Sequence, residues 1–110
     1  MDKRYTALGT SMLVLKLLEK EPMYGYQIIK TLEQQSSQVF RLQEGTLYPI
    51  LHGLEQQGAV ISQTASAPSG RIRKYYHITP SGRKLLQEKL QEWETYQTAV
   101  NQVIGGVLFE

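Results

Sequence analysis

The sequence predicts a mainly α-helical protein with a small β-hairpin, arranged as a winged helix-turn-helix followed by a C-terminal dimerisation helix. Three observations predict this fold class. Apolar residues recur at helical spacing in three separate segments of the first half of the chain. From Val60 to Ile78 the apolar spacing becomes two, which is typical of strands. Beyond Thr79 a seven-residue repeat begins and runs almost to the last residue.

The first two helices are predicted from their apolar faces. Residues 8–18 are rich in Leu, Met and Val, which indicates a helix buried on most sides. Thr10 or Ser11 is a suitable N-cap, and Pro22 ends the helix because the residue before a proline avoids helical geometry. A second helix is expected at residues 24–35, where one face collects the apolar positions Tyr24, Ile28, Ile29 and Leu32.

The third helix is expected at residues 44–57. Leu47, Leu51 and Leu54 follow the spacing i, i+4, i+7 and predict a core stripe. Gly58 is placed where a left-handed residue would end the helix. Pro49 is expected near the start of the helix, where its missing N–H does least harm.

A β-hairpin is predicted from residues 60–64 and 71–78. The connecting segment, residues 65–70, is rich in Ser, Pro and Gly, and we expect a loose tip that does not pack. Two neighbouring tyrosines in the second strand point to opposite faces. Tyr76 is predicted to be the core residue, because it is in phase with Ile72 and Ile78.

The fourth helix begins with Thr79 as N-cap and Pro80 at the first helical position. Its seven-residue repeat predicts contact with a partner helix, and the expected dimer interface is Leu86, Leu90, Trp93, Gln97, Val100 and Ile104. Helicity is not expected beyond Ile104, because two glycines follow, and residues 107–109 form a tail or an additional packing element. The chain is therefore divided into residues 1–78, the winged helix-turn-helix, and residues 79–110, the C-terminal dimerisation helix and tail.

Composition and charge narrow the function. The net charge is only +2, but no acidic residue lies between Glu55 and Glu88, where five cations fall: Arg71, Arg73, Lys74, Arg83 and Lys84. Such a local patch indicates a phosphate-binding surface, although a solvated charged face is the alternative. There is no cysteine, and the apolar runs are too short for a membrane span or a signal peptide. We expect a cytoplasmic protein with no membrane partner.

In a winged helix-turn-helix the third helix enters the major groove and the hairpin reaches the flanking backbone. The DNA-binding candidates are therefore Tyr24, Lys30, Gln43, Thr46, Tyr48, Ser69, Gly70, Arg71, Arg73, Lys74 and Tyr75. Two of them have alternatives: Tyr48 can pack under the wing, and Lys30 can be a solvated lysine. Strand alternation places Arg71 and Arg73 on one face of the hairpin and Lys74 on the other.

No catalytic or metal-binding constellation is apparent. His52 and His77 stand far apart in the sequence and lack carboxylates at ligand spacing, so neither a metal site nor a nucleophile–base pair can be assembled. We expect no enzyme activity and no cofactor. The alternative to a DNA-binding regulator is a winged-helix module for protein interaction or small-molecule sensing, with weak or no DNA binding.

Three motifs carry a family resemblance. Residues 22–28, PMYGYQI, resemble the G-P-x-x-G-Y-E-I segment of the PadR-like transcriptional regulators, with Gln27 where an acidic residue is common. Residues 45–51, GTLYPIL, with Leu54-Glu55 and Gly58 resemble the G-T-L-Y-P-x-L-x-x-L-E-x-x-G helix of that family. Residues 73–76, RKYY, with Ile78-Thr79 and Gly82 are similar to its R-K-Y-Y-x-L-T-x-x-G wing.

The resemblance implies a homodimeric repressor of a pseudo-palindromic operator, often released by a small molecule. This chain ends in one short helix instead of a long C-terminal domain. In some short relatives an aromatic residue of the terminal helix lines a drug pocket at the dimer interface. Trp93 is the residue that could do so here, with a small aromatic effector, and a packed interface tryptophan is the other interpretation.

Overall fold

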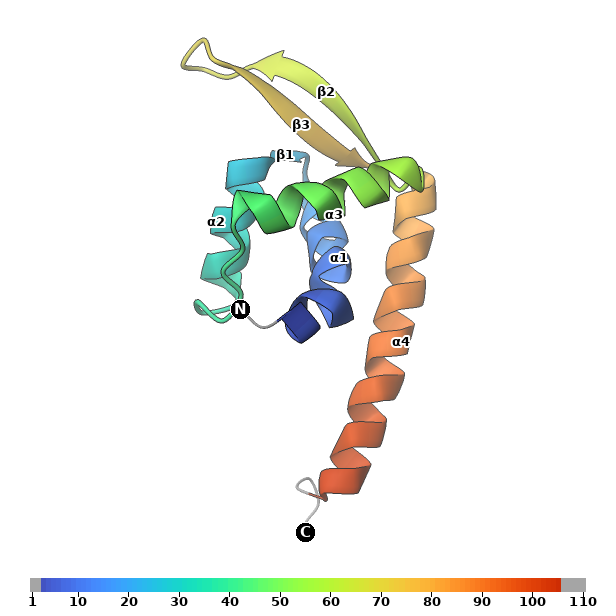
Figure 1. Cartoon of the computed structure of the whole chain (residues 1–110). Helices are drawn as coiled ribbons and strands as arrows, with labels where there is room; N and C mark the ends of the chain where they lie inside the picture. The colour runs from blue at the N-terminus through green and yellow to red at the C-terminus, as the bar shows by residue number, and fades with distance from the viewer. Residues whose placement is uncertain (1–2, 106–110) are drawn as a thin grey trace.

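A computed structural model describes the backbone of residues 3–105 and the side chains from Gly9 onward. The order of elements is α1 (Lys3–Lys20), β1 (Met23–Tyr24), α2 (Gly25–Gln35), α3 (Glu44–Gln56), β2 (Val60–Ser66), β3 (Ile72–Ile78) and α4 (Pro80–Ile104). Figure 1 shows α1, α2 and α3 packed together, a hairpin above α3, and α4 running beside α1 and continuing past it. The predicted fold class is confirmed.

The first helix differs most from its prediction. α1 begins at Lys3 rather than at residue 8, and it ends at Lys20, shortly before Pro22, as expected. Thr10 and Ser11 therefore lie inside the helix, and the prediction that one of them is the N-cap is wrong. Thr10 is buried on the core side one turn before Val14, so packing rather than capping explains its position.

The two helices of the helix-turn-helix match their predictions within one residue at each end. In the turn between them Ser37 and Gln38 adopt left-handed backbone angles, with φ of 52° and 71°. The Ser36 hydroxyl accepts a hydrogen bond from the Phe40 amide at 2.9 Å. Gly58 follows α3 with φ of 75°, as expected for a residue that ends a helix.

Pro49 is inside α3 and not at its start. It lies in the second helical turn, where its ring removes the hydrogen bond that the Gly45 carbonyl would otherwise receive. Gly45 is exposed, and a Cβ built on it would meet no atom within 4 Å, so water can reach this carbonyl. The helix therefore tolerates Pro49 because water can bind the Gly45 carbonyl, and not because Pro49 lies at the helix start.

The sheet has a third strand that the sequence did not reveal. The strand order is β1-β3-β2, with Met23 opposite Tyr76 and Tyr24 opposite Tyr75. β1 has two residues, which is too short to produce a recognisable alternation. It nevertheless fastens the start of α2 directly to the wing.

The wing is longer and tighter than predicted, and the expected loose tip is wrong. β2 continues to Ser66, and the Ala67 amide then donates to the Arg71 carbonyl at 2.7 Å. The Gly70 amide donates to the Ala67 carbonyl at 2.8 Å, and Gly70 has φ of 87°. This is a compact three-residue turn, since Pro68 suits its first central position and glycine its left-handed one. Ala67 is buried, with only 5% of its surface exposed.

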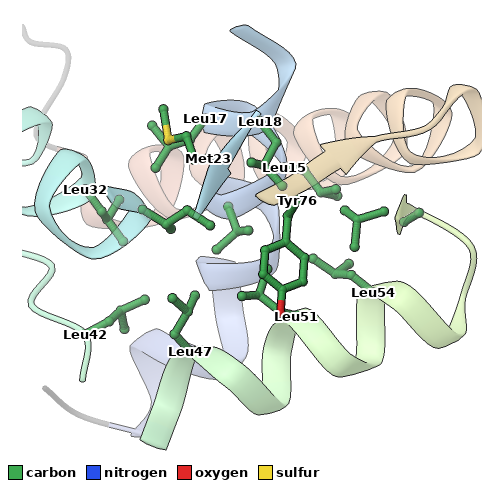
Figure 2. Packing of buried hydrophobic residues seen from close by; sticks show 14 of the residues in the cluster. Leu15, Leu17, Leu18, Met23, Leu32, Leu42, Leu47, Leu51, Leu54 and Tyr76 are labelled. Atoms are coloured by element: carbon green, nitrogen blue, oxygen red, sulfur yellow. The ribbon is translucent and has the colours of Figure 1, made fainter. Parts of the chain in front are cut away.

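One core joins all these elements. Figure 2 shows Tyr76 lying over Leu51 and Leu54 of α3, among leucines from α1 and α2. Tyr76 is buried, which confirms its predicted role. Ile72, predicted in phase with it, is 73% exposed because the hairpin extends beyond the helices at that point. The predicted stripe of Leu47, Leu51 and Leu54 is buried in full.

The wing is joined to α4 without a linker. The Thr79 hydroxyl accepts from the Gly82 amide at 3.0 Å and donates to the Gly58 carbonyl at 2.6 Å, which confirms the predicted N-cap. The Thr79 amide donates to the Ala59 carbonyl at 3.0 Å. A Cβ at Gly82 would collide with that same carbonyl oxygen, so α4 needs glycine there.

α4 ends where expected. Its last residue is Ile104, and Gly105 closes it with φ of 67°. The predicted tail at residues 107–109 lies outside the described residues. Among residues 3–105 no helix combines the length and the apolarity needed to cross a bilayer.

Candidate nucleic-acid interface

A groove of about 600 Å³ lies where the starts of α2 and α3 face the wing. Its lining includes five of the predicted DNA-binding residues: Tyr24, Tyr48, Arg71, Arg73 and Lys74. Figure 1 shows the hairpin tip on the same side of the molecule as the first turn of α3. The structure therefore brings residues from three separate segments to one surface, as the winged helix-turn-helix interpretation requires.

Tyr48 is held at the floor of this groove by Gly25. The Tyr48 ring and hydroxyl approach Gly25 so closely that a Cβ there would clash with them. Tyr48 therefore packs against α2, while 38% of its surface stays exposed. Burial raises the pKa of the Tyr48 hydroxyl, and the nearby Glu44 carboxylate raises it further. The hydroxyl thus stays protonated and can donate a hydrogen bond.

A second arrangement involves Tyr24, Arg73 and Tyr75. Tyr24 and Tyr75 are cross-strand partners, and their rings meet edge to face with centroids 5.6 Å apart and planes at 82°. Arg73 is two residues before Tyr75, and its Cζ lies 4.2 Å from the centre of the Tyr24 ring. The separation is typical of a stacked cation–π contact. These three side chains lie on one face of the sheet.

Lys74 is on the opposite face, as strand alternation predicted. Its Nζ is 5.6 Å from the centre of the Tyr76 ring, at the edge of the core. Arg71 is exposed at the tip of the wing, next to Ser69 and Gly70. The groove lining thus has three cations and one carboxylate, that of Glu44. This surplus of positive charge suits a phosphate backbone.

Gln43 and Thr46 flank the groove at the start of α3. The Gln43 carbonyl accepts hydrogen bonds from the amides of Thr46 at 3.0 Å and Leu47 at 2.9 Å, so the backbone of Gln43 forms the N-cap. Its side chain is exposed and makes no capping bond. Thr46 is half-buried. Gln43 is the N-cap of α3, and Thr46 lies in its first turn.

Lys30 is not part of the groove lining, and its surroundings favour the solvated-lysine interpretation. Its Nζ is 3.7 Å from the Glu33 carboxylate and 5.5 Å from the centre of the Tyr26 ring. The ammonium group is solvated, and such an exposed pair within one helix contributes little energy.

Sequence reasoning missed four lining residues: Gly25, Tyr26, Glu44 and Ile72. Gly25 lies in the motif at residues 22–28, but only the structure shows that Tyr48 packs against it. Ile72 was assigned to the core by alternation, which gives the face of a strand but not how far the strand reaches.

The second half of α4 forms a different kind of surface. Of the predicted interface, Leu86 is buried and Leu90 half-buried in the chain's own core, so Leu86 has no surface left for a partner. Trp93, Gln97 and Ile104 are exposed and Val100 is half-buried. Two exposed apolar residues were missed, Tyr96 and Val103.

A cavity of about 300 Å³ lies between α1 and α4. It is lined by Gly9, Ser11, Met12, Lys89, Glu92, Trp93 and Tyr96. The rings of Trp93 and Tyr96 are 5.9 Å apart and nearly parallel, at 29°. The cavity combines two aromatic faces with one carboxylate and one ammonium group.

Metal binding has no support in the described part of the chain. From residue 9 to residue 105 no three His, Asp or Glu side chains come together as a metal site would require. His52 is exposed and His77 is half-buried.

Comparison with known proteins identifies a family. The profile of the Transcriptional regulator PadR-like family matches residues 14–88. The curated Transcriptional regulator Rv3488 of Mycobacterium tuberculosis (strain ATCC 25618 / H37Rv) is 39% identical over 67 residues, covering 61% of this chain and 59% of that protein.

Two solved structures share the fold over most of the chain. A PadR family transcriptional regulator from Eggerthella lenta DSM 2243 is 31% identical, with a TM-score of 0.80 and coverage of 94% of this chain and 88% of the other. A PadR family transcription regulator from hypervirulent Clostridium difficile R20291 is 33% identical, with a TM-score of 0.74 and coverage of 86% and 96%.

Proposed function

This chain belongs to the PadR-like family of transcriptional regulators, and on that premise we propose that it is a homodimeric repressor that binds a pseudo-palindromic operator in double-stranded DNA. Members of this family are DNA-binding regulators and not enzymes. The family resemblance supports the repressor role.

The cationic groove between the start of α3 and the wing is the observation that carries the proposal. The start of α3 enters the major groove, with Gln43, Thr46 and Tyr48 facing the base edges or the phosphates. The neutral Tyr48 hydroxyl is a hydrogen-bond donor there. The wing contacts the flanking backbone through Ser69, Gly70, Arg71, Arg73 and Lys74. Lys30 is the weakest candidate, because it is not part of the groove lining.

A second copy of the chain covers the distal half of α4 in this proposal. Val103 and Ile104 expose 86% and 68% of their surfaces, and they continue an apolar face with Tyr96 and Val100. A contiguous exposed apolar patch is typical of a protein-interaction surface. Two α4 helices packed along this stripe place the two DNA-binding units, here called reading heads, at successive major grooves about 34–36 Å apart. Residues 1–78 then form the DNA-binding unit and 79–110 the dimerisation unit.

The cavity between α1 and α4 supports a small-molecule effector. Stacked aromatic rings beside a carboxylate suit a planar aromatic compound, in particular a cationic one. An effector bound at α4 changes the distance between the two DNA-binding units of the dimer. The protein with effector and the protein without it then differ in affinity for the operator. Because Trp93 is the single tryptophan, its fluorescence reports occupancy directly. Such a regulator acts in the cytoplasm, where the operator DNA is accessible.

Selection of bound fragments from a random DNA pool tests the proposal and yields operator and half-site spacing together. We expect an inverted repeat whose two halves are about one helical turn apart. The test pair is the double variant Arg71→Ala with Lys74→Ala, and the control is Lys20→Ala, which removes an exposed charge outside the groove lining. The double variant loses affinity and the control keeps it.

Two outcomes contradict the proposal. Recovery of no enriched sequence, with the protein folded, favours the winged-helix interaction or sensing module. Equal binding by the wing variant and the control removes the wing from the interface.

A further inference from the structure

We propose that Tyr24 is a positioning residue for DNA binding: its ring holds the Arg73 guanidinium in place in the groove that both residues line. The inference rests on the proposed function. It assigns to Tyr24 an action through Arg73 rather than a contact of its own with DNA.

The stacking geometry is the first support. The Arg73 Cζ lies 4.2 Å from the Tyr24 ring centre, so the guanidinium covers the ring face. A stacked guanidinium keeps its N–H donors free, because they lie in its plane and point away from the ring. The contact therefore fixes the orientation of the group without using the donors that bind a phosphate.

Tyr24 is held in place by two constraints on its backbone and one on its ring. Its backbone pairs with Tyr75 in the sheet and forms the N-cap of α2. The Tyr75 ring meets the Tyr24 ring edge to face at 5.6 Å, which limits its rotation. The two-residue strand β1 thus provides a rigid platform for a side chain of the wing.

The charge of Arg73 is not neutralised within the chain. Among the side chains that the structure describes, no carboxylate lies within ion-pair distance of Arg73, in contrast to Lys30 and its partner Glu33. Arg73 also lines the groove together with Tyr24. An oriented and unpaired guanidinium loses less side-chain freedom when it binds a phosphate than a mobile one does.

A double-mutant cycle on the full chain tests this arrangement. The variants are Tyr24→Leu, Arg73→Ala, both together, and Tyr24→Phe, with affinity for the selected operator measured by fluorescence anisotropy over a salt series. Arg73→Ala lowers the salt slope by about one. Tyr24→Leu lowers affinity by about 3- to 30-fold with the slope unchanged, because the charge remains. Tyr24→Phe keeps near-normal affinity, and Tyr24→Leu has no further effect once Arg73 is absent.

A measurement without DNA accompanies the cycle. The aromatic ring shifts the NMR signal of the Arg73 Hε proton upfield in the parent protein and in Tyr24→Phe, and this shift disappears in Tyr24→Leu. Where Tyr24→Leu does not fold by circular dichroism, Tyr24→Thr replaces it, since threonine suits both a strand and an N-cap.

The outcomes separate the two proposals. Additive losses in the cycle, or an unshifted Hε signal, overturn the positioning role while DNA binding stands. A Tyr24→Phe variant as weak as Tyr24→Leu indicates that the hydroxyl contacts DNA directly, which also overturns it. Absence of DNA binding by the parent protein overturns the proposed function and this inference with it.

Discussion

The groove end of the molecule and the distal half of α4 are built in opposite ways. At the groove, aromatic rings, glycines and cations contact one another within the chain: Tyr48 on Gly25, and Arg73 on Tyr24. Along α4 beyond Trp93, the large apolar side chains have few neighbours in the same chain, and Val103 is the most exposed of them. One surface is complete in a single copy, and the other needs a partner to bury its apolar area.

This difference in packing assigns a separate role in DNA binding to each surface. The groove supplies the contacts with DNA and the α4 stripe supplies the second reading head, so a change in one should leave the other intact. The predictions below test that independence.

The largest expected effect is on α4. Val100→Glu places a charge on the apolar stripe and should give a monomer, which loses the gain in affinity from binding two half-sites, about 100- to 10 000-fold. Affinity for an isolated half-site should not change. Light scattering gives the mass and anisotropy gives the two affinities. Gln102→Glu is the matched control on the exposed opposite side of the helix; a dimeric Val100→Glu protein would refute the assigned stripe.

The second-largest effect is expected on folding stability, at the junction between the sheet and α4. Gly82→Ala places a Cβ against the Ala59 carbonyl oxygen and should lower the free energy of unfolding by about 1–3 kcal/mol. Gly53→Ala is the control, because its Cβ would meet no atom within 4 Å and alanine favours a helix. Urea unfolding measures both. Equal stability of the two variants would mean that α4 can move away from the sheet freely.

A smaller effect is expected within the groove. Gly25→Ala pushes the Tyr48 ring out of its place, and DNA affinity should fall about tenfold, the value of one charge-assisted hydrogen bond. The fold should survive, since the displaced atoms are the far end of a side chain. Anisotropy measures the affinity, and light scattering should still report a dimer. Unchanged affinity would exclude Tyr48 from the interface.

The smallest effect concerns pH. Because burial raises the pKa of Tyr48, its hydroxyl stays protonated beyond the usual value of about 10. The folded form holds this proton more tightly than the unfolded one, so the linked stability is complete below about pH 10 and is lost as pH rises through the raised pKa. Comparing tyrosinate absorbance of the parent protein with Tyr48→Phe shows which titration step is missing. A missing step at or below the usual value would contradict the assignment.

Elements with a regular apolar period or a local capping signal could be predicted from the sequence. Elements without such a signal, and contacts between segments distant in the sequence, could not. The stripe of Leu47, Leu51 and Leu54 and the cap at Thr79 were correctly predicted, because a helical period and a Thr-Pro start are local signals. The start of α1 was missed because residues 3–7 carry no apolar stripe of their own. β1 was missed because two residues form no period, although it is what brings Tyr24 to the wing.

The site followed the same rule. The motif residues around Tyr48 and Arg73 were identified from their order along the chain, and the structure brings them to one groove. That Arg73 stacks on Tyr24, and that Leu86 is turned into the core, depends on side-chain packing between segments distant in sequence. No local pattern reports such contacts.

The capped junction at Thr79 has a consequence for operator choice. A flexible tether between a DNA-binding unit and its dimerisation element lets the two units adapt to many spacings, at an entropic penalty that grows with tether length. Here the strand passes into the helix within one residue, held by bonds to the Gly58 and Ala59 carbonyls. A dimer of this protein should accordingly tolerate very few insertions between half-sites, with each added base pair rotating one half away from its reading head.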